Sequence, residues 1–259
     1  MVLIRDLKKI FNRRTVDEKV AINGLELTVE KGDFITVIGS NGAGKTTLLN
    51  LIAGTYLPDE GKIFIDGLEI TRLKEHQRAK FLGRVFQNPG LGTAPSMTIA
   101  ENLSMAELRG CFRGLSFGVT RSGRKRYQEI LRPLDLGLET RLSDRVSLLS
   151  GGQRQCLSLI MATLNPPKVL LLDEHTASLD PKTVEKVMAL TDRIIRDHSL
   201  TAIMVTHNLS QAIYYGNRLI MLHEGKIHLD IQGDEKKSLT VPEVIKRFGG
   251  TLKDETLLC

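Results

Sequence analysis

The chain has 259 residues, of which 41% are hydrophobic and 25% are charged, and its formal net charge is +6. That apolar content suffices for a hydrophobic core and excludes a disordered chain, while the length fits one large α/β domain or two small ones. Three widely spaced cysteines, Cys111, Cys156 and Cys259, match no metal-ligand pattern or disulfide framework and favour a reducing compartment. No apolar run approaches the roughly 20 residues of a membrane helix, and charge comes too early for a signal peptide. We therefore expect a soluble intracellular protein, whose mild basicity permits phosphate ligands, nucleic acid or an anionic membrane surface.

Strands flank a glycine-rich turn in the first third of the chain. Apolar and polar side chains alternate over residues 25–29, which is the period of a half-buried strand. Residues 34–38 are mostly apolar, as in a buried strand. A helix is expected over residues 45–53, where Gly54 is placed to end it, and a short strand over residues 62–65 lies between two turns.

The middle of the chain, from about residue 88 to 165, is rich in helices and loops. Thr98 and Glu101 form a capping-box pattern that opens one of these helices. Asn165 precedes two prolines and therefore ends the last helix of the segment, because a residue before proline resists the helical conformation.

The last third again alternates strands and helices. Buried strands are expected over residues 169–172 and 201–205, and a hairpin over 219–222 and 227–231. Asp180 and Pro181 predict a helix start. One face of that helix consists of Val184, Val187, Met188, Thr191 and Ile195. The whole pattern predicts an α/β fold with a mostly parallel sheet and a helical insertion.

A phosphate-binding loop lies between the strand at 34–38 and the helix at 45–53. Its sequence matches the pattern G-x-x-x-x-G-K-[ST] and comprises Gly39, Ser40, Asn41, Gly42, Ala43, Gly44, Lys45 and Thr46, with Thr47 following. The three glycines allow the positive torsions and the close backbone approach that wrapping a triphosphate requires, and the helix N-terminus favours the anion. We expect Lys45 to reach the outer phosphates and Thr46 to hold Mg²⁺.

Two carboxylates end the buried strand at 169–172. Asp173 is placed to complete the Mg²⁺ shell, and Glu174 to polarise an attacking water as general base. The alternative is a strand that simply ends in solvent on two acidic residues. The phosphate-binding loop favours the catalytic interpretation.

A second glycine motif, Leu149-Ser150-Gly151-Gly152-Gln153, precedes an apolar helix expected to begin near Arg154. Ser150 can cap that helix, and the bare glycine backbone can receive an anion. With this motif the sequence resembles the ATP-binding-cassette (ABC) family of ATPases over most of the chain. The resemblance implies a P-loop NTPase fold with a mostly parallel core sheet, an antiparallel β subdomain and a helical insertion. It also implies one nucleotide-binding domain over residues 1–259, with a core lobe at about 1–87 and 166–259 and a helical lobe at about 88–165.

The family resemblance assigns further roles. In the family, this second glycine motif is called the signature, and ATP lies between the phosphate-binding loop of one subunit and the signature of another. The resemblance therefore implies that the partner's nucleotide is contacted by Ser150, Gly151, Gly152 and Gln153. Gln87 resembles the glutamine that joins the two lobes and senses Mg²⁺ and water. The loop that ends at Asp180 resembles the one that contacts the opposite subunit, and His207 resembles the switch histidine that contacts the terminal phosphate.

Two positions depart from the common family pattern. His175 stands where these proteins often carry proline, which should alter the loop without affecting the carboxylate before it. Phe11 is the best match for the aromatic residue that stacks on adenine, although a long segment, residues 12–19, separates it from the next strand. The alternative is that Phe11 is a core residue of an edge strand.

Seven basic residues and one acidic residue lie between Arg109 and Arg132. The basic residues are Arg109, Arg113, Arg121, Arg124, Lys125, Arg126 and Arg132. They form either a solvated loop or a contact with anionic lipid headgroups.

The resemblance implies an ATPase with ATP and Mg²⁺ as cofactors. The leading interpretation is the ATPase subunit of a membrane transporter, most similar to bacterial importers of amino acids or other small organic solutes. It implies a second ATPase subunit in a homodimer, separate permease subunits, an extracytoplasmic solute-binding protein and a place at the cytoplasmic face of the membrane, with no nucleic acid. The alternatives are a soluble cassette ATPase acting on nucleic acid or ribosomes, and a binding module without catalysis.

Overall fold

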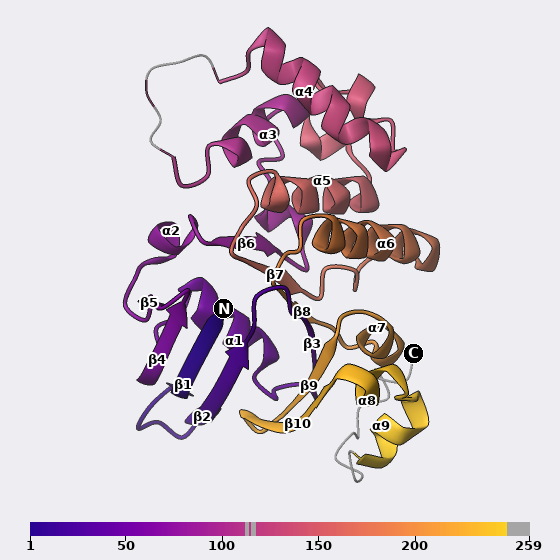
Figure 1. Ribbon diagram of the computed structural model, residues 1–259. Helices are drawn as coiled ribbons and strands as arrows, with labels where there is room; N and C mark the ends of the chain where they lie inside the picture. The colour runs from indigo at the N-terminus through magenta and orange to yellow at the C-terminus, as the bar shows by residue number, and fades with distance from the viewer. Residues whose placement is uncertain (112–113, 115–117, 248–259) are drawn as a thin grey trace.

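Two β-sheets and several layers of helices make up the protein (Figure 1). The computed structural model describes residues 1–111, 114 and 118–247. The smaller sheet is antiparallel, with the strand order β2-β1-β4-β5. Its strands are β1 (Val2–Phe11), β2 (Lys19–Val29), β4 (Glu60–Ile65) and β5 (Leu68–Glu69).

The larger sheet has the order β10-β9-β3-β8-β7-β6 and is parallel except for the β9–β10 hairpin. Its strands are β3 (Phe34–Ile38), β6 (Leu82–Val85), β7 (Val169–Asp173), β8 (Ala202–Val205), β9 (Arg218–His223) and β10 (Lys226–Gln232). The expected strands and the mostly parallel α/β fold are confirmed. Because the carboxyl ends of parallel strands meet at one edge, this sheet brings the loops after β3, β7 and β8 together.

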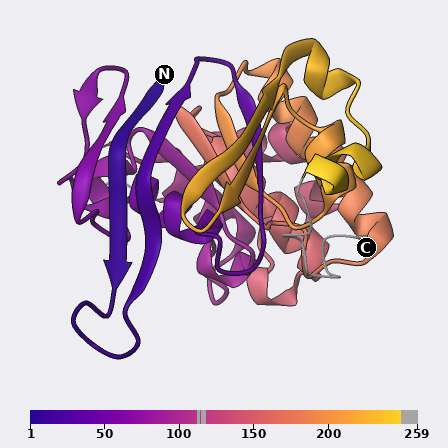
Figure 2. The same cartoon turned by 90° about the horizontal axis from the view of Figure 1, so that it is seen from below.

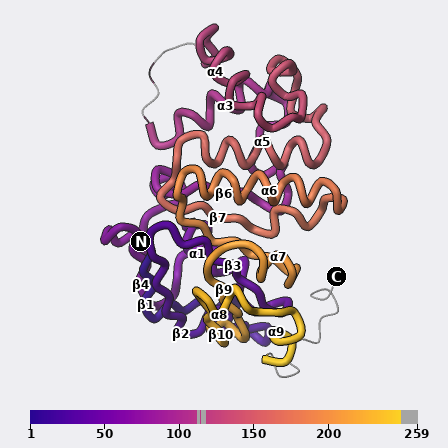
Figure 3. Tube along the Cα trace, turned by 45° about the vertical axis from the view of Figure 1, so that its right-hand side comes forward, coloured from indigo at the N-terminus to yellow at the C-terminus, as the bar shows by residue number. Residues whose placement is uncertain are grey.

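The helices have the following bounds. They are α1 (Lys45–Ala53), α2 (Glu75–Arg78), α3 (Ile99–Glu107), α4 (Arg121–Leu131), α5 (Gly151–Thr163), α6 (Pro181–Asp197), α7 (Leu209–Tyr214), α8 (Gly233–Lys237) and α9 (Val241–Arg247). Short 3₁₀ turns occupy Pro89–Leu91, Arg132–Leu134, Leu138–Thr140 and Val146–Leu148. In Figure 3, α5 lies between the strands and the more distant α3 and α4, and α6 runs along α5 at the level of β6 and β7.

The side chains of β7 alternate between two hydrophobic clusters of the core. Leu170 and Leu172 point into the cluster shared with α5 and α6, whereas Val169 and Leu171 pack with α1 and the antiparallel sheet. All four side chains are fully buried. A strand buried on both faces needs a continuous apolar run, which is what the sequence of β7 provides.

Capping residues set the helix limits. Thr98 and Glu101 form the expected capping box at α3. Helix α5 begins at Gly151, three residues before the expected position, because Ser150 and Gln153 form a reciprocal capping box that closes the first turn over both glycines. Helix α1 ends at Gly54, whose φ of 86° is the left-handed conformation of a C-cap glycine.

Arg78 ties α1 to the antiparallel sheet. It is fully buried, and its guanidinium donates to the carbonyl oxygens of Leu51 and Ile52 near the end of α1, at 2.6 and 2.9 Å, and of Thr71 and Leu73 at 2.8 and 2.9 Å. Burial lowers the pKa of Arg78 to about 10. The four carbonyl groups replace water as partners of a buried charge.

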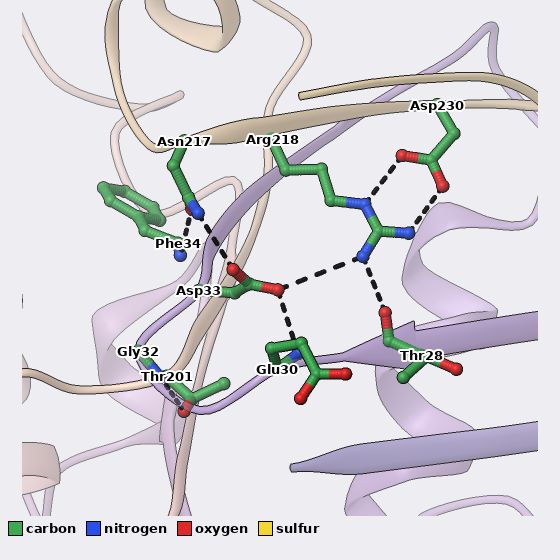
Figure 4. A network of polar contacts seen from close by, with 9 residues as sticks. All are labelled: Thr28, Glu30, Gly32, Asp33, Phe34, Thr201, Asn217, Arg218 and Asp230. Atoms are coloured by element: carbon green, nitrogen blue, oxygen red, sulfur yellow. Dashed lines mark hydrogen bonds and ion pairs between the residues drawn. The ribbon is translucent and has the colours of Figure 1, made fainter. Parts of the chain in front are cut away.

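Arg218 joins the two sheets through a network of polar contacts (Figure 4). Its guanidinium binds both carboxylate oxygens of Asp230 on β10, at 2.7 and 2.5 Å. It also donates to the carbonyl oxygen of Thr28 on β2 and lies 3.9 Å from Asp33. Asp33 in turn accepts a hydrogen bond from Asn217, which fixes the start of β3. A planar guanidinium suits such a junction because it presents several donors at fixed angles.

Candidate nucleotide-binding site

The loop after β3 has the backbone that the glycines predict. Gly39, Gly42 and Gly44 have φ values of 152°, 81° and 104°. A Cβ at Gly39 would lie 2.3 Å from the carbonyl oxygen of Leu222, and one at Gly44 would lie 2.5 Å from that of Ala21. Side chains are therefore excluded at these two positions by contact as well as by torsion. The resulting loop ends on the N-terminus of α1, which favours an anion.

Lys45 is buried under its own loop. Its ammonium donates to the carbonyl oxygens of Gly39 and Ser40, at 2.6 and 3.1 Å, and only 7% of the residue is exposed. The charge is thus held beneath the glycines, where an ammonium and backbone amides can act together on phosphate oxygens.

Asp173 ends β7 beside the start of α1. Its Oδ1 lies 3.4 Å from Oγ1 of Thr46, and its Oδ2 lies 3.4 Å from Nη2 of Arg84 on the adjacent strand β6. Burial raises the pKa of Asp173, and the charge of Arg84 opposes that rise. Arg84 is held in turn by Asn50 Oδ1, 2.6 Å away, and lies 4.5 Å from the ring of Phe86.

The donors near Asp173 fit a magnesium ion. Mg²⁺ is bound in nucleotide sites by one or two carboxylates, a hydroxyl and the phosphates themselves rather than by an all-protein cage. Thr46 and Asp173 supply the hydroxyl and the carboxylate. In the described part of the chain no group of three or more His, Cys, Asp or Glu side chains could hold a metal ion by itself.

Glu174 and His207 meet at the ends of β7 and β8. Oε2 of Glu174 lies 3.4 Å from Nδ1 of His207. This contact lowers the pKa of Glu174 and raises that of His207. Glu174 has a φ of 43°, a left-handed torsion that is costly for a residue other than glycine and is concentrated at functional sites.

A pocket brings several expected residues together. It is lined by the loop, by Glu174 and by the end of the β1–β2 hairpin. Its lining residues are Phe11, Lys19, Ala21, Asn41, Gly42, Gly44, Lys45, Thr46, Thr47 and Glu174. Phe11 is only partly buried, and its ring lies edge-on to that of Tyr56, with the ring centroids 5.2 Å apart. Phe11 therefore packs against Tyr56 and also lines the pocket.

A second pocket adjoins the first at Thr46. Gln87 lines it together with Thr46, Asp173 and Arg84. Gln87 itself is exposed, and the carbonyl oxygen of its neighbour Phe86 accepts a hydrogen bond from Gln155 of α5. The segment at Gln87 is therefore anchored to the helical layer.

The signature residues lie elsewhere in this single chain. Ser150 and Asp180 cap α5 and α6, and these two helices pack against each other, since a Cβ at Gly152 would lie 2.3 Å from the side chain of Thr183. Neither Ser150 nor Asp180 lines the two pockets described above. Both capping residues are exposed to solvent.

His175 turns away from the two carboxylates into the core. It is 2% exposed, and its Nε2 lies 3.1 Å from Oγ1 of Thr191 on α6. Burial lowers the pKa of His175 to about 4, so the imidazole is neutral near pH 7. This side chain anchors the loop after Glu174 to α6.

The second half of the basic segment is a helix rather than a loop, and the cations on that helix are exposed to solvent. Four of its cations lie on α4, where Arg126 pairs with Glu107 and Arg124 donates to Ser143. Arg109 is partly buried and donates to the carbonyl oxygens of Ala162 and Asn165 behind α5. Arg113 lies outside the described residues.

Sequence reasoning missed Arg84 and Lys19. Arg84 was visible as a cation within an apolar strand, three residues before Gln87. Lys19 follows the long segment after Phe11, and nothing in the local pattern places it in the pocket.

Comparisons with known proteins identify the family. A family model described as ABC transporter matches residues 22–177. The chain is 47% identical over 248 residues to a tyrosine transport ATP-binding protein of Clostridioides difficile, covering 96% of this chain and 98% of that protein. It is 35% identical to the spermidine/putrescine import ATP-binding protein PotA of Haemophilus influenzae, covering 89% of this chain but only 57% of that relative.

A similar structure is the dimeric post-hydrolysis state of an ATP-binding cassette bound to ADP and Pi. It matches with a TM-score of 0.76 and 30% sequence identity, covering 90% of this chain and 98% of that chain. The fold is that of an ATPase cassette. The chain belongs to the ABC transporter family, and the predicted resemblance is confirmed. These relatives do not favour an ATPase acting on nucleic acid or ribosomes.

Proposed function

We propose that the protein is the ATPase subunit of a bacterial importer for a small organic solute, with an amino acid such as tyrosine as the first candidate. The support for the solute is the similarity to the tyrosine transport protein along nearly the full length of both chains. The observation that carries the ATPase mechanism is the pocket that combines Lys45, Thr46 and Glu174.

The loop residues 39–47 bind the phosphates, and Phe11 stacks on the adenine. Lys45 neutralises the outer phosphates. Thr46 and Asp173, with Gln87, hold Mg²⁺, which supplies further charge neutralisation at the phosphates when bound. Glu174 accepts a proton from the attacking water, and His207 orients this carboxylate and contacts the terminal phosphate.

Two copies of the chain close around two ATP molecules. Ser150, Gly151, Gly152 and Gln153 of one copy present a capped helix N-terminus to the terminal phosphate bound by its mate, and Asp180 contacts the opposite subunit. The exposure of Ser150, its absence from the pocket of its own chain and the dimeric cassette of similar fold support this arrangement. Binding of ATP favours the closed pair, and hydrolysis releases it.

The chain forms one cassette with two lobes. Residues 1–259 act together, with a core lobe at about 1–87 and 166–259 and a helical lobe at about 88–165.

A groove between α2, α3 and α5 receives the permease subunits. It is lined by His76, Phe86, Leu91 and Met105 among others. Within the described residues no helix is long and apolar enough to cross a bilayer. The protein accordingly binds the cytoplasmic face of the membrane through the permease, which an extracytoplasmic solute-binding protein supplies with solute.

Glu174→Gln tests the catalytic assignment. The variant should bind ATP with native affinity, accumulate as a dimer in ATP and hydrolyse it at least about 100-fold more slowly, because only the proton acceptor is removed. Gel filtration with ATP and steady-state phosphate release measure both properties. Lys45→Ala is the matched control, which should lose binding itself. Hydrolysis by Glu174→Gln near the native rate would assign the base elsewhere.

The solute is tested separately in cells. A strain whose only copy carries Glu174→Gln should take up labelled tyrosine at the background rate, while uptake of labelled spermidine is unchanged. Unchanged tyrosine uptake would remove tyrosine as the solute and leave the ATPase assignment intact.

A further inference from the structure

Lys19 faces the nucleotide pocket from the same side of the hairpin as Phe11. The two residues are directly opposite in the antiparallel pairing of β1 and β2. Opposed residues of such a pair point to the same face of the sheet, with Cβ atoms about 5 Å apart. Both line the pocket that contains the phosphate-binding loop. The hairpin end, which projects beyond the rest of the antiparallel sheet in Figure 2, therefore offers an aromatic ring and an ammonium side by side.

The ammonium of Lys19 lies against the phosphate-binding loop. A Cβ built at Gly42 would be 3.0 Å from Nζ of Lys19 and 3.9 Å from its Cε. Gly42 belongs to the turn whose backbone approaches the phosphates. Lys19 thus has the phosphate-binding loop on one side and Phe11 opposite it on the neighbouring strand.

This ammonium lacks a counter-ion in the part of the chain that the structure describes. No carboxylate there lies within the 4.0 Å of an ion pair from Lys19, whereas Lys9 and Arg13 of the same hairpin lie 3.7 and 3.8 Å from Asp59. The one carboxylate of the pocket, that of Glu174, is in contact with His207. An uncompensated cation beside a glycine-rich loop creates a local potential that favours an anion.

We propose that Lys19 is a second phosphate-binding residue of this protein, which contacts the phosphate chain of a nucleoside di- or triphosphate whose base lies on Phe11. The inference rests on the nucleotide site proposed above and deepens it. Lys45 acts from beneath the loop, and Lys19 acts from the hairpin. The hairpin thereby adds to the preference of the loop and Lys45 for nucleotides over nucleosides.

Binding measurements on Lys19→Met test the proposal. Calorimetric titration should show ATP and ADP binding weakened by about three- to tenfold, as expected for one partly exposed charge-assisted contact, with adenosine binding, measured by competition with a fluorescent ADP, unchanged. The loss should shrink in 0.5 M salt, because exposed ionic contacts are screened. Lys19→Arg should restore binding to within about twofold of native. Arg14→Met is the matched control, since it removes an exposed cation of the same hairpin that does not line the pocket.

The outcomes separate this inference from the proposed function. Equal affinities of Lys19→Met and native protein for ATP and ADP would overturn the role of Lys19 alone. The same loss for adenosine as for ADP would show that Lys19 only supports the hairpin, which also overturns it. Native protein that binds no ATP would instead refute the nucleotide site itself.

Discussion

Lys236 and Lys237 are neighbours in α8 with opposite surroundings. Lys236 is 2% exposed and its ammonium donates to the carbonyl oxygens of Tyr215 and Gly216. Burial lowers its pKa from 10.5 to about 8. The side chain of Lys237 is 79% exposed and pairs with Asp234. Sequence proximity therefore says little about the electrostatic cost of a charge.

This contrast predicts a pH dependence of stability. Between about pH 8 and 10.5 the unfolded chain binds a proton at Lys236 that the folded chain has released, so folding becomes more favourable as pH rises through this range. Relative to Lys236→Met, the native protein should gain about 2 kcal/mol of unfolding free energy between pH 7.5 and 10, after allowance for solvent screening.

Urea unfolding at several pH values measures this gain. The free energy of unfolding of Lys237→Met should change with pH in the same way as that of the native protein, because the charge of Lys237 is exposed to solvent. Parallel curves for the native protein and Lys236→Met would show that the buried amine keeps its ordinary pKa.

At the scale of elements, Arg78 holds together pieces that the chain order separates. It joins the end of α1, the segment after β5 and α2 by hydrogen bonds to four carbonyl groups. Gly54 leaves room for it, since a Cβ there would lie 2.7 Å from Nε of Arg78. The helix that presents the phosphate-binding loop is thus fixed at its far end.

Arg78→Met should lower the free energy of unfolding by about 3 kcal/mol or more, because it leaves buried carbonyl groups without donors. The midpoint of urea unfolding reports the change. Arg72→Met is the control, since Arg72 is exposed in the same segment, and it should shift stability by less than about 0.5 kcal/mol. A similar small shift for Arg78→Met would mean that water or a neighbour replaces the guanidinium.

At the scale of the molecule, the proposed nucleotide site is divided between two copies. The signature helix α5 is capped and positioned by α6 within its own chain, but its N-terminus does not line the pocket of that chain. A site built this way works only if the second copy supplies the missing helix end.

Mixing two inactive variants tests the division. Ser150→Arg blocks the signature and Glu174→Gln removes the base, so each variant alone should be inactive. A mixed dimer contains one site with both native parts, and random pairing should restore about a quarter of the native hydrolysis. Phosphate release from equimolar mixtures measures this recovery. No recovery from properly folded, mixed dimers would contradict a shared site.

Local patterns were sufficient for much of the architecture. The strand at 169–172, the helix at 45–53 and the caps at Thr98, Ser150 and Asp180 appear where they were expected. Such features depend on neighbours a few residues away, through torsion, capping and apolar periodicity. The start of α5 was misplaced because two glycines obscured a helix that its capping box begins earlier.

The sequence alone determined the phosphate-binding loop, the acidic end of β7 and the family, because each resides in a short run whose backbone conformation is local. Only the tertiary structure decided that Arg84 meets Asp173, that Glu174 meets His207 and that Lys19 stands opposite Phe11. Those pairs depend on which strands become neighbours and in which register. Strand register is set by packing over the whole molecule, so a short-range sequence pattern does not predict it.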